Sequence, residues 1–320
     1  MELTTVWFLV IAFLWTGYFV LEGFDFGVGA LLPLLSRDEG ERKQMLATIG
    51  PVWDGNEVWL ITAVGAMFAA FPAWYAGLLS GFYLPLVMVL IGLIMRGVSL
   101  EWRGKVLARE RALCDAGIVA GSVLTAFLWG GIFGNLLYGS LPGTLLGGAL
   151  SLTLAVLHGA VFVALKTTGP LRARARRAAL AAAVVVLPVA VVALPALPSA
   201  STAEAAGSGG AEVAGAGWTS HPLLWAAALA AMIALAAAVA LIWRRREGWA
   251  FTATAASIVL ITGTLFGTLW RAPLPGLTVA EAASGPYTLG MLTWIGLAAL
   301  PFVLAYQGWT YWVFRRRVTA

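Results

Sequence analysis

The stretch Gly50-Pro51-Val52-Trp53-Asp54-Gly55-Asn56-Glu57-Val58-Trp59 places two acids at the start of an apolar run that continues to about residue 71. Asp54 and Glu57 are three residues apart, so a helix would put them on the same side. An ionisable side chain that faces hydrocarbon costs roughly 2.5 to 3.5 kcal/mol on insertion scales, so it must face protein or water. The stretch therefore predicts a membrane helix that carries acids for a functional reason.

A second acidic stretch, Glu22-Gly23-Phe24-Asp25-Phe26-Gly27-Val28-Gly29, lies inside the first apolar run. Glu22 and Asp25 are again three residues apart and share one helical face. Gly23, Gly27 and Gly29 make this helix thin, so we expect another backbone to pack closely against it near Asp25. The two stretches together are the strongest functional signal in the chain.

The composition predicts an all-α, polytopic integral membrane protein. Of the 320 residues, 61% are hydrophobic and only 11% are charged. Apolar runs of about twenty residues, the length that a helix needs to cross a bilayer, recur along the chain. About nine membrane-spanning helices are predicted, near residues 5–35, 50–71, 76–97, 115–137, 144–165, 178–197, 222–243, 250–270 and 288–313.

We expect these helices to form a single transmembrane domain over residues 1–320. The first four helices, within 1–137, carry the acidic motifs, and the second four occupy 144–270. An Ala/Gly/Ser-rich stretch at 198–221 is predicted to be a mobile outer loop, and the last helix covers 288–313. The first apolar run lacks a basic start and a cleavage site, so it is predicted to be a retained helix.

Basic residues predict the orientation of the bundle, because Arg and Lys gather in cytoplasmic loops. They fall in alternate loops, near residues 37–43, 96–111, 166–177, 244–246 and 315–317, and only Arg271 lies on the opposite side. The amino terminus is therefore predicted outside and the carboxyl terminus in the cytoplasm, which requires an odd number of spans. The net charge of +5 thus reflects topology, and no nucleic-acid partner is expected.

This orientation places the acids in the cytoplasmic half of the membrane, where Arg96 ends the third span. A charge-paired network is geometrically feasible among Asp25, Asp54, Glu57 and Arg96. Such groups can exchange protons. The candidates for a proton pathway are Asp25, Asp54, Glu57, Glu22 and Glu101, with Arg96 as charge partner and Trp53, Asn56 and Trp59 lining the motif. The alternative is that these acids are helix caps and interfacial ion pairs through which no proton moves.

These motifs resemble subunit II of the cytochrome bd-type quinol oxidases of bacteria. The stretches 22–29 and 51–60 resemble the signatures of its first and second helices. Arg96-Gly97-Val98-Ser99-Leu100-Glu101-Trp102-Arg103 resembles the end of its third helix, and 288–294 and 306–312 are similar to its last. The resemblance runs essentially from end to end, although some members carry Gln at the position of Glu57.

The resemblance implies a heterodimer that oxidises quinol and reduces dioxygen to water, generating proton motive force without pumping. A homologous subunit I would carry two haem b and one haem d. This chain would bind no cofactor alone and would not be catalytic alone. It would support assembly of subunit I and contribute to cytoplasmic proton delivery past Asp54 and Asp25.

The resemblance also implies a multi-pass location in the bacterial plasma (inner) membrane, with lipid and quinol as further partners. The family allows a small accessory subunit and a structural quinone or lipid within this chain. The excess of Arg over Lys and the abundant Ala indicate a GC-rich genome and favour menaquinol as the quinol.

The chain offers few ligands for a metal or a haem. Its only histidines are His158 in the fifth predicted span and His221 at the outer mouth of the seventh, and Cys114 is its only cysteine. Three haems need several axial ligands, so we expect this chain to hold no metal and His158 to be a hydrogen-bonded packing residue. Tryptophans near predicted span ends are expected at the membrane interface, namely Trp7, Trp15, Trp74, Trp218, Trp270 and Trp312.

Two other functions are compatible with the acids. In an ion-coupled secondary transporter, Asp25 and Asp54 would bind a coupling ion between helices. Transporters usually place that site near the midplane and use both halves of the chain, whereas the acids here crowd one side. In a pure scaffold, the chain would only complete the walls of the haem pocket and should tolerate Asp54→Asn.

Overall fold

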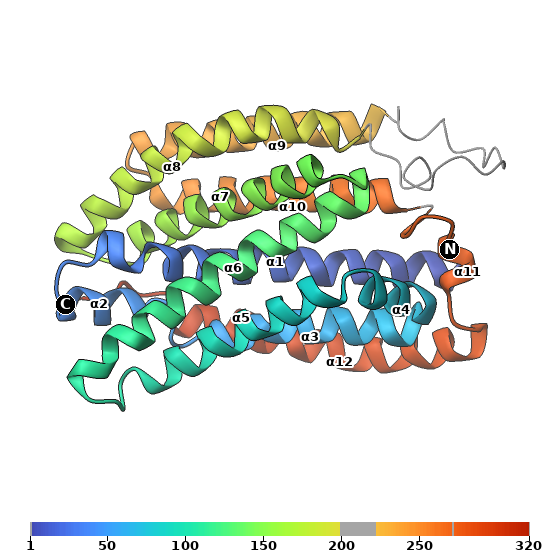
Figure 1. Ribbon diagram of the computed structural model, residues 1–320, viewed down its shortest axis with the longest axis horizontal. Helices are drawn as coiled ribbons and strands as arrows, with labels where there is room; N and C mark the ends of the chain where they lie inside the picture. Colours follow the sequence, from blue (N-terminus) through green and yellow to red (C-terminus); the bar gives the residue numbers. More distant parts are fainter. Residues whose placement is uncertain (1, 199–221, 271, 320) are drawn as a thin grey trace.

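The computed structural model describes residues 2–198, 222–270 and 272–319, which form a bundle of helices that run side by side along its long axis (Figure 1). The elements in chain order are α1 (Leu3–Leu35), α2 (Glu39–Leu46), α3 (Trp53–Ala70), α4 (Pro72–Gly81), α5 (Tyr83–Trp102), the 3₁₀ turn η1 (Ala108–Glu110), α6 (Arg111–Tyr138), α7 (Leu141–Lys166), α8 (Gly169–Ala196), α9 (Pro222–Trp243), α10 (Glu247–Leu269), α11 (Val279–Ala282) and α12 (Pro286–Val313). No strand occurs in these ranges, so the all-α prediction is confirmed. The predicted outer loop beyond Pro198, together with Trp218, His221 and Arg271, lies outside the described residues.

The number of membrane-spanning helices agrees with the prediction. Eight helices in the described ranges are long and apolar enough to cross a membrane, and α3 with α4 supplies a ninth if this bent pair is one span. Each long helix coincides with one of the apolar runs, because in a lipid environment a helix satisfies all its backbone hydrogen bonds internally.

The chain turns sharply within the region that joins the second and third predicted spans. α3 and α4 are bent by 119° relative to each other, and α5 begins only at Tyr83. A residue that precedes proline avoids the helical region of φ and ψ. Phe71, between α3 and α4, follows this rule, with φ −138° and ψ 66°. Pro72 then starts α4, where its missing N–H is not needed. The predicted start of the third span at residue 76 is therefore wrong, since 72–81 form a separate short helix.

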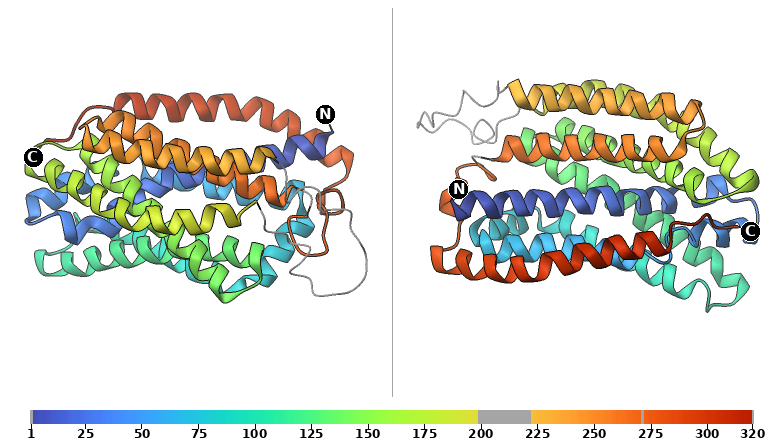
Figure 2. Two further views of the ribbon diagram at one scale, coloured as in Figure 1. Left: turned by 90° about the horizontal axis from the view of Figure 1, so that it is seen from above. Right: turned by 180° about the vertical axis from the view of Figure 1, so that it is seen from behind.

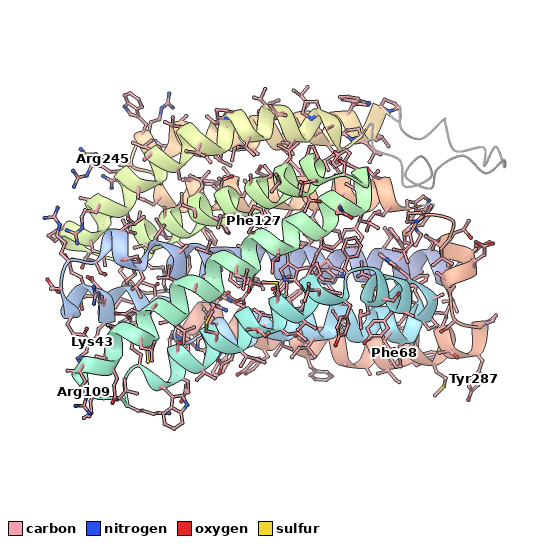
Figure 3. The ribbon with its side chains drawn as sticks, in the orientation of Figure 1. Lys43, Phe68, Arg109, Phe127, Arg245 and Tyr287 are labelled. Carbon is pink, nitrogen blue, oxygen red and sulfur yellow. The ribbon has the colours of Figure 1, made fainter. Side chains whose placement is uncertain are left out.

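The two termini lie at opposite ends of the bundle, as an odd number of crossings requires (Figure 1). Lys43, Arg109 and Arg245 lie toward the end that holds the carboxyl terminus, and Tyr287 lies at the other (Figure 3). We call the end that holds α2, η1, the α9–α10 turn and the carboxyl terminus the basic end. The clustering of cations there agrees with the loop pattern in the sequence, and the side of the membrane that this end faces stays a prediction.

α1 lies in the middle of the bundle and contacts α3, α6, α7 and α10 (Figures 1 and 2). Its contact with α7 is a backbone contact: a Cβ atom at Gly27 would lie 1.9 Å from the carbonyl oxygen of Ala155. The close approach expected from the glycines of the first span is therefore present. Only a residue without a side chain fits there. This close contact between α1 and α7 fixes the rotation of α1 and hence the direction of Asp25.

Aromatic side chains fill much of the core around the amino-terminal half of α1. Trp7, Trp15 and Trp74 are almost fully buried, so they pack inside the bundle and do not face lipid. Their depth in the membrane stays a prediction. Trp15 packs edge to face on Trp129 with 4.9 Å between ring centroids. These rings bury large apolar areas, and the indole N–H of Trp129 finds a partner in the Tyr18 hydroxyl at 3.0 Å.

Ion pairs fasten α2 to the long helices at the basic end. Arg103 pairs with Glu39 at 2.9 Å, and Arg174 pairs with Glu41. The hydrogen bond from Arg103 is the main reason that the pKa of Glu39 lies below its usual value, and the bond from Arg174 lowers the pKa of Glu41 in the same way. A separate pair joins Arg103 to Asp115 of α6 at 2.5 Å. The loop between α1 and α3 is therefore held in place.

Candidate functional site

Arg96 of α5 is the centre of a buried cluster of acids from α1 and α3. Its guanidinium pairs with Glu22 and with Glu57, whose Oε1 lies 3.2 Å from Nη1. Its Nη2 lies 3.9 Å from Oδ2 of Asp25. The side chains of Arg96, Glu22 and Asp25 are fully buried, whereas that of Glu57 remains 26% exposed. We call these four residues the acid cluster.

The local sequence explains why these side chains meet. Glu22 and Asp25 point the same way from α1 because they are three residues apart. Gly121 of α6 lets α5 approach, since a Cβ atom there would lie 2.8 Å from the Cβ of Arg96. The Arg96 guanidinium also lies over the ring of Phe26, 5.1 Å from the ring centroid. The quadrupole of the ring attracts the cation and so stabilises the charged guanidinium.

The acid cluster contains three carboxyl groups and one cation. If all of them were ionised, two negative charges would remain uncompensated in a buried site, which is costly. Glu22 Oε2 and Asp25 Oδ1 have no hydrogen-bond partner among the described protein atoms. A group of acids with too few cations can lower this cost by binding a proton, so the cluster is suited to proton uptake and release.

Asn56 connects Asp25 to the rest of the site. Its side chain is fully buried, and its Nδ2 donates to Asp25 Oδ2 at 2.7 Å and to the Leu21 carbonyl at 3.4 Å. On the other side, its Oδ1 accepts from Gln307 Nε2 at 3.2 Å and from the Tyr311 hydroxyl at 2.8 Å. All four hydrogen-bonding positions of the amide are therefore used.

Gln307 and Tyr311 of α12 are site residues that the sequence prediction missed. They are four residues apart and so face the same neighbour. The signal in the sequence was this polar pair at helical spacing within the last apolar run, inside the motif 306–312. That signal identifies a polar face of α12, but it does not reveal which of the other helices the face contacts.

Asp54 is not part of the buried network, so its predicted pairing with Asp25, Glu57 and Arg96 is wrong. It makes no ion pair within the described part of the chain and is exposed. The reason is the rotation of α3, whose buried side is centred on Asn56. Asp54 instead begins an exposed stripe at helical spacing that continues along Val58, Ile61, Gly65 and Phe68.

The remaining predicted residues lie around the acid cluster and outside it. Glu101 is exposed and pairs with Lys105 at 2.5 Å. Trp53 packs on Gly97, which is next to Arg96. A Cβ atom at Gly97 would lie 3.4 Å from the Trp53 ring. Trp59 packs against α1 and meets Phe13 edge to face, with 5.5 Å between ring centroids.

His158 of α7 is a packed, hydrogen-bonded residue. Its Nε2 lies 3.2 Å from the Val20 carbonyl, which can only accept, so this nitrogen carries the proton. Its Nδ1 lies 2.7 Å from the Thr254 hydroxyl, and its ring stacks on Phe251 with 4.6 Å between centroids. Both ring nitrogens are engaged, so the surroundings of His158 do not fit an axial haem ligand.

The rest of the described chain likewise offers no metal centre. Within residues 2–198, 222–270 and 272–319 no group of three or more His, Cys, Asp or Glu side chains is arranged to hold a metal ion. Cys114 is a free, partly buried thiol. Among the described residues, the buried acids can bind protons and the polar side chains around them can form hydrogen bonds.

Comparison with known proteins gives the same family over nearly the whole chain. The family model described as cytochrome bd terminal oxidase subunit II matches residues 3–314. The chain is 38% identical to cytochrome bd ubiquinol oxidase subunit 2 of Bacillus subtilis (strain 168), covering 99% of this chain and 97% of the relative. It is 32% identical to cytochrome bd-I ubiquinol oxidase subunit 2 of Escherichia coli (strain K12), covering 98% and 94%.

The fold is also found in a solved structure. A chain of the bd oxidase from Geobacillus thermodenitrificans superposes with a TM-score of 0.77 at 17% identity, covering 98% of this chain and 99% of that one. This likeness supports the fold, and the family model and the two relatives carry the assignment. The chain therefore belongs to the family of cytochrome bd terminal oxidase subunit II.

Proposed function

We propose that this chain is the haem-free integral subunit of a bacterial quinol oxidase, in which a homologous subunit I carries the haems. Its relatives are named as subunits of cytochrome bd ubiquinol oxidases. Haem bound in subunit I would supply the oxygen chemistry, and the quinol would be oxidised there. This chain would support the assembly of subunit I in the inner membrane. A menaquinol substrate and a small accessory subunit stay predictions.

The second part of the proposal is that this chain delivers protons through the acid cluster. The observation that carries it is a fully buried Glu22, Asp25 and Arg96 in contact with a Glu57 that is still 26% exposed. A proton would enter at the exposed Asp54, pass to Glu57, which is still partly exposed, and continue to Glu22 or Asp25. Arg96 would hold the carboxyl groups together and offset part of their charge.

Subunit I would dock on the face formed by α3, α5 and α12, which we call the docking face. These helices lie along one edge of the bundle (Figures 1 and 2). The face carries large exposed apolar side chains, among them Ile61, Ile94 and Trp294. It also carries Asp54, and an acid that faced lipid near the membrane would be costly, so protein rather than lipid should cover it.

An apolar cavity is the proposed place for the structural lipid or quinone tail that the family allows. It measures about 120 Å³ and lies among α1, α6, α7, α8 and α10. Trp129, Phe133 and Leu150 are among its lining residues. A pocket with such a lining favours hydrocarbon over a polar headgroup.

The test is oxygen consumption with a soluble quinol by the purified complex, measured with its haem spectrum. We expect Asp25→Asn and Asp54→Asn to keep the haems and to lose turnover by at least about tenfold, the usual scale for removing a proton-transfer group. Glu110→Gln, at an exposed acid in η1, is the matched control and should leave turnover unchanged.

The other outcomes separate the competing functions. Intact haems with unchanged turnover in both Asn variants would contradict the proton route and leave the scaffold. Loss of the haems would give these acids a structural role. If the wild-type complex consumed no oxygen, the transporter would become the better hypothesis.

A further inference from the structure

α12 is held to the bundle by a small number of polar contacts. In the described chain Leu289 is its one buried residue, and most of its large side chains are exposed. Near its start, Trp7 Nε1 donates to the Leu289 carbonyl at 3.2 Å and to Thr293 Oγ1 at 3.0 Å. Toward its end, Gln307 and Tyr311 bind Asn56. The hydrogen bonds to Asn56 are therefore a main attachment of this helix.

The orientation of the Asn56 amide follows from its partners. The Leu21 carbonyl can only accept, so the Nδ2 group of Asn56 must face α1, where Asp25 also lies. The oxygen must then face α12, where the Gln307 amide and the Tyr311 hydroxyl donate to it. Gly55 gives Gln307 the space it needs, since a Cβ atom at Gly55 would lie 3.3 Å from its Oε1.

We propose that Gln307 and Tyr311 are positioning residues that aim the Asn56 amide at Asp25 and strengthen the hydrogen bond Asp25 receives. The proposal rests on the proposed proton route through Asp25. It assigns α12, which contributes no acid, a part in setting the properties of the acid cluster.

The physical basis is the polarisation of one hydrogen bond by the next. When donors approach the oxygen of an amide, its N–H groups become better donors, and in condensed phase each bond is strengthened by roughly 10–30%. Tyr311 and Gln307 act on Asn56 in this way, and Asn56 acts on Asp25. Without them, the amide would also lose the contacts that fix its direction.

The first experiment compares two Tyr→Phe variants of the same helix in the complete complex. Tyr311→Phe removes only the hydroxyl that binds Asn56, whereas Tyr287→Phe makes the same change at an 81% exposed position far along α12. We expect Tyr311→Phe to keep the haem spectrum and to lower turnover by about three- to tenfold, less than loss of a proton-transfer group. Tyr287→Phe should match wild type.

The second measurement separates positioning from a loss of structure. The infrared carboxyl bands that disappear in Asp25→Asn should shift in Tyr311→Phe and stay in place in Tyr287→Phe, because only the former alters the hydrogen bond to Asp25. In addition, Tyr311→Phe should lower turnover no further in an Asn56→Leu background, since both changes act through one amide.

The outcomes distinguish this inference from the proposed function. If Asp25→Asn keeps full turnover, the proton route fails and the inference fails with it. If Asp25→Asn loses turnover while Tyr311→Phe matches Tyr287→Phe in turnover and in the infrared bands, only the inference is overturned. If Tyr311→Phe lowers turnover equally with and without the Asn56→Leu substitution, Tyr311 acts by another route and the inference is also overturned.

Discussion

Arg96 is the buried cation that offsets the charge of three carboxyl groups, those of Glu22, Asp25 and Glu57. Removing one partner of a buried ion pair costs about 3–5 kcal/mol, because it leaves the others uncompensated. We therefore expect Arg96→Gln to lower the thermal stability of the purified complex by an amount in this range. Thermal unfolding followed by tryptophan fluorescence measures it.

Lys105→Gln is the control for this prediction. It also removes a cation bound to a glutamate, but at a site where both side chains are 59% exposed, and such pairs contribute about 0–1 kcal/mol. If the two variants unfolded at the same temperature, Arg96 would not be the residue that compensates the acids.

The sequence predicted the members of the acid cluster better than their contacts. Asp25, Glu57 and Arg96 were expected in one charge-paired network, because charges inside apolar runs need partners, whereas Glu22 was expected only as a proton-pathway candidate. Asp54 was expected among them since i and i+3 positions lie close on a helix, but periodicity does not fix which side of α3 faces α1. Tyr311 was missed because its contact with Asn56 spans 255 residues.

At the scale of single elements, the contact between α1 and α7 depends on Gly27. A methyl group there would overlap the Ala155 backbone, which cannot rotate away as a side chain can. We expect Gly27→Ala to destabilise the complex by about 1–3 kcal/mol, the usual cost of overpacking. Gly263→Ala in α10 is the matched control, since no atom lies within 4 Å of its added methyl group and α10 is not part of the docking face.

The two glycine variants should move in opposite directions. In a helix interior, alanine is favoured over glycine by roughly 0.5–1 kcal/mol, so Gly263→Ala should leave stability unchanged or raise it slightly. Chemical unfolding of the detergent-solubilised complex would show both effects. Equal stability of the two variants would contradict a backbone contact at Gly27.

The attachment of α2 should depend on pH. The pKa values of Glu39 and Glu41 are lowered from about 4.5 by hydrogen bonds from Arg103 and Arg174. A carboxyl group with a lowered pKa in the folded state stabilises the fold above its unfolded pKa, and this contribution is lost as the pH falls through the folded value. The attachment should therefore be complete near neutral pH and weaken below about pH 4.5.

Hydrogen exchange across 39–46, corrected for the intrinsic effect of pH, measures this attachment. Protection should decrease below about pH 4.5 in wild type, and it should already be low near neutral pH in the double variant Arg103→Gln with Arg174→Gln. Protection that is independent of pH in wild type would show that these ion pairs do not hold α2.

The observed starts and ends of the helices show how much of the fold the local sequence patterns predict. Apolar runs located the long helices, because in lipid a spanning segment must be a helix of about twenty residues. The same patterns did not reveal the turn at Phe71, since α3 and α4 are both apolar and only Pro72 marks the break. Trp15 was placed at the interface by its position near a predicted end, yet it lies in the core against Trp129.

At the scale of the whole molecule, the docking face can be tested by adding bulk. Fluid lipid accommodates a larger apolar side chain, whereas a packed protein interface does not. Ile61 on α3 and Val184 on α8 are similarly exposed, at 70% and 73%, and only Ile61 lies on the docking face. We expect Ile61→Trp to reduce the amount of subunit I that co-purifies with this chain and Val184→Trp to leave it unchanged.

The reverse pattern would place subunit I on the α8 side, and equal recovery in both variants would show that neither position is in the interface.

The orientation of the bundle belongs to this scale too. Alternating basic loops predicted termini at opposite ends, and they are found there (Figure 1). The division of residues 1–320 into one domain with three segments stays a prediction.

The contact between Asn56 and α12 has a consequence for the synthesis of the protein. The partners of the Asn56 carbonyl are made 251 and 255 residues after it. At translation rates of about 5–20 residues per second, this delay lasts on the order of 12 to 50 s. For that time the nascent chain holds a polar group beside Asp25 that only its final helix can satisfy. The environment of Asp25 is thus completed last, and a truncated chain never acquires it.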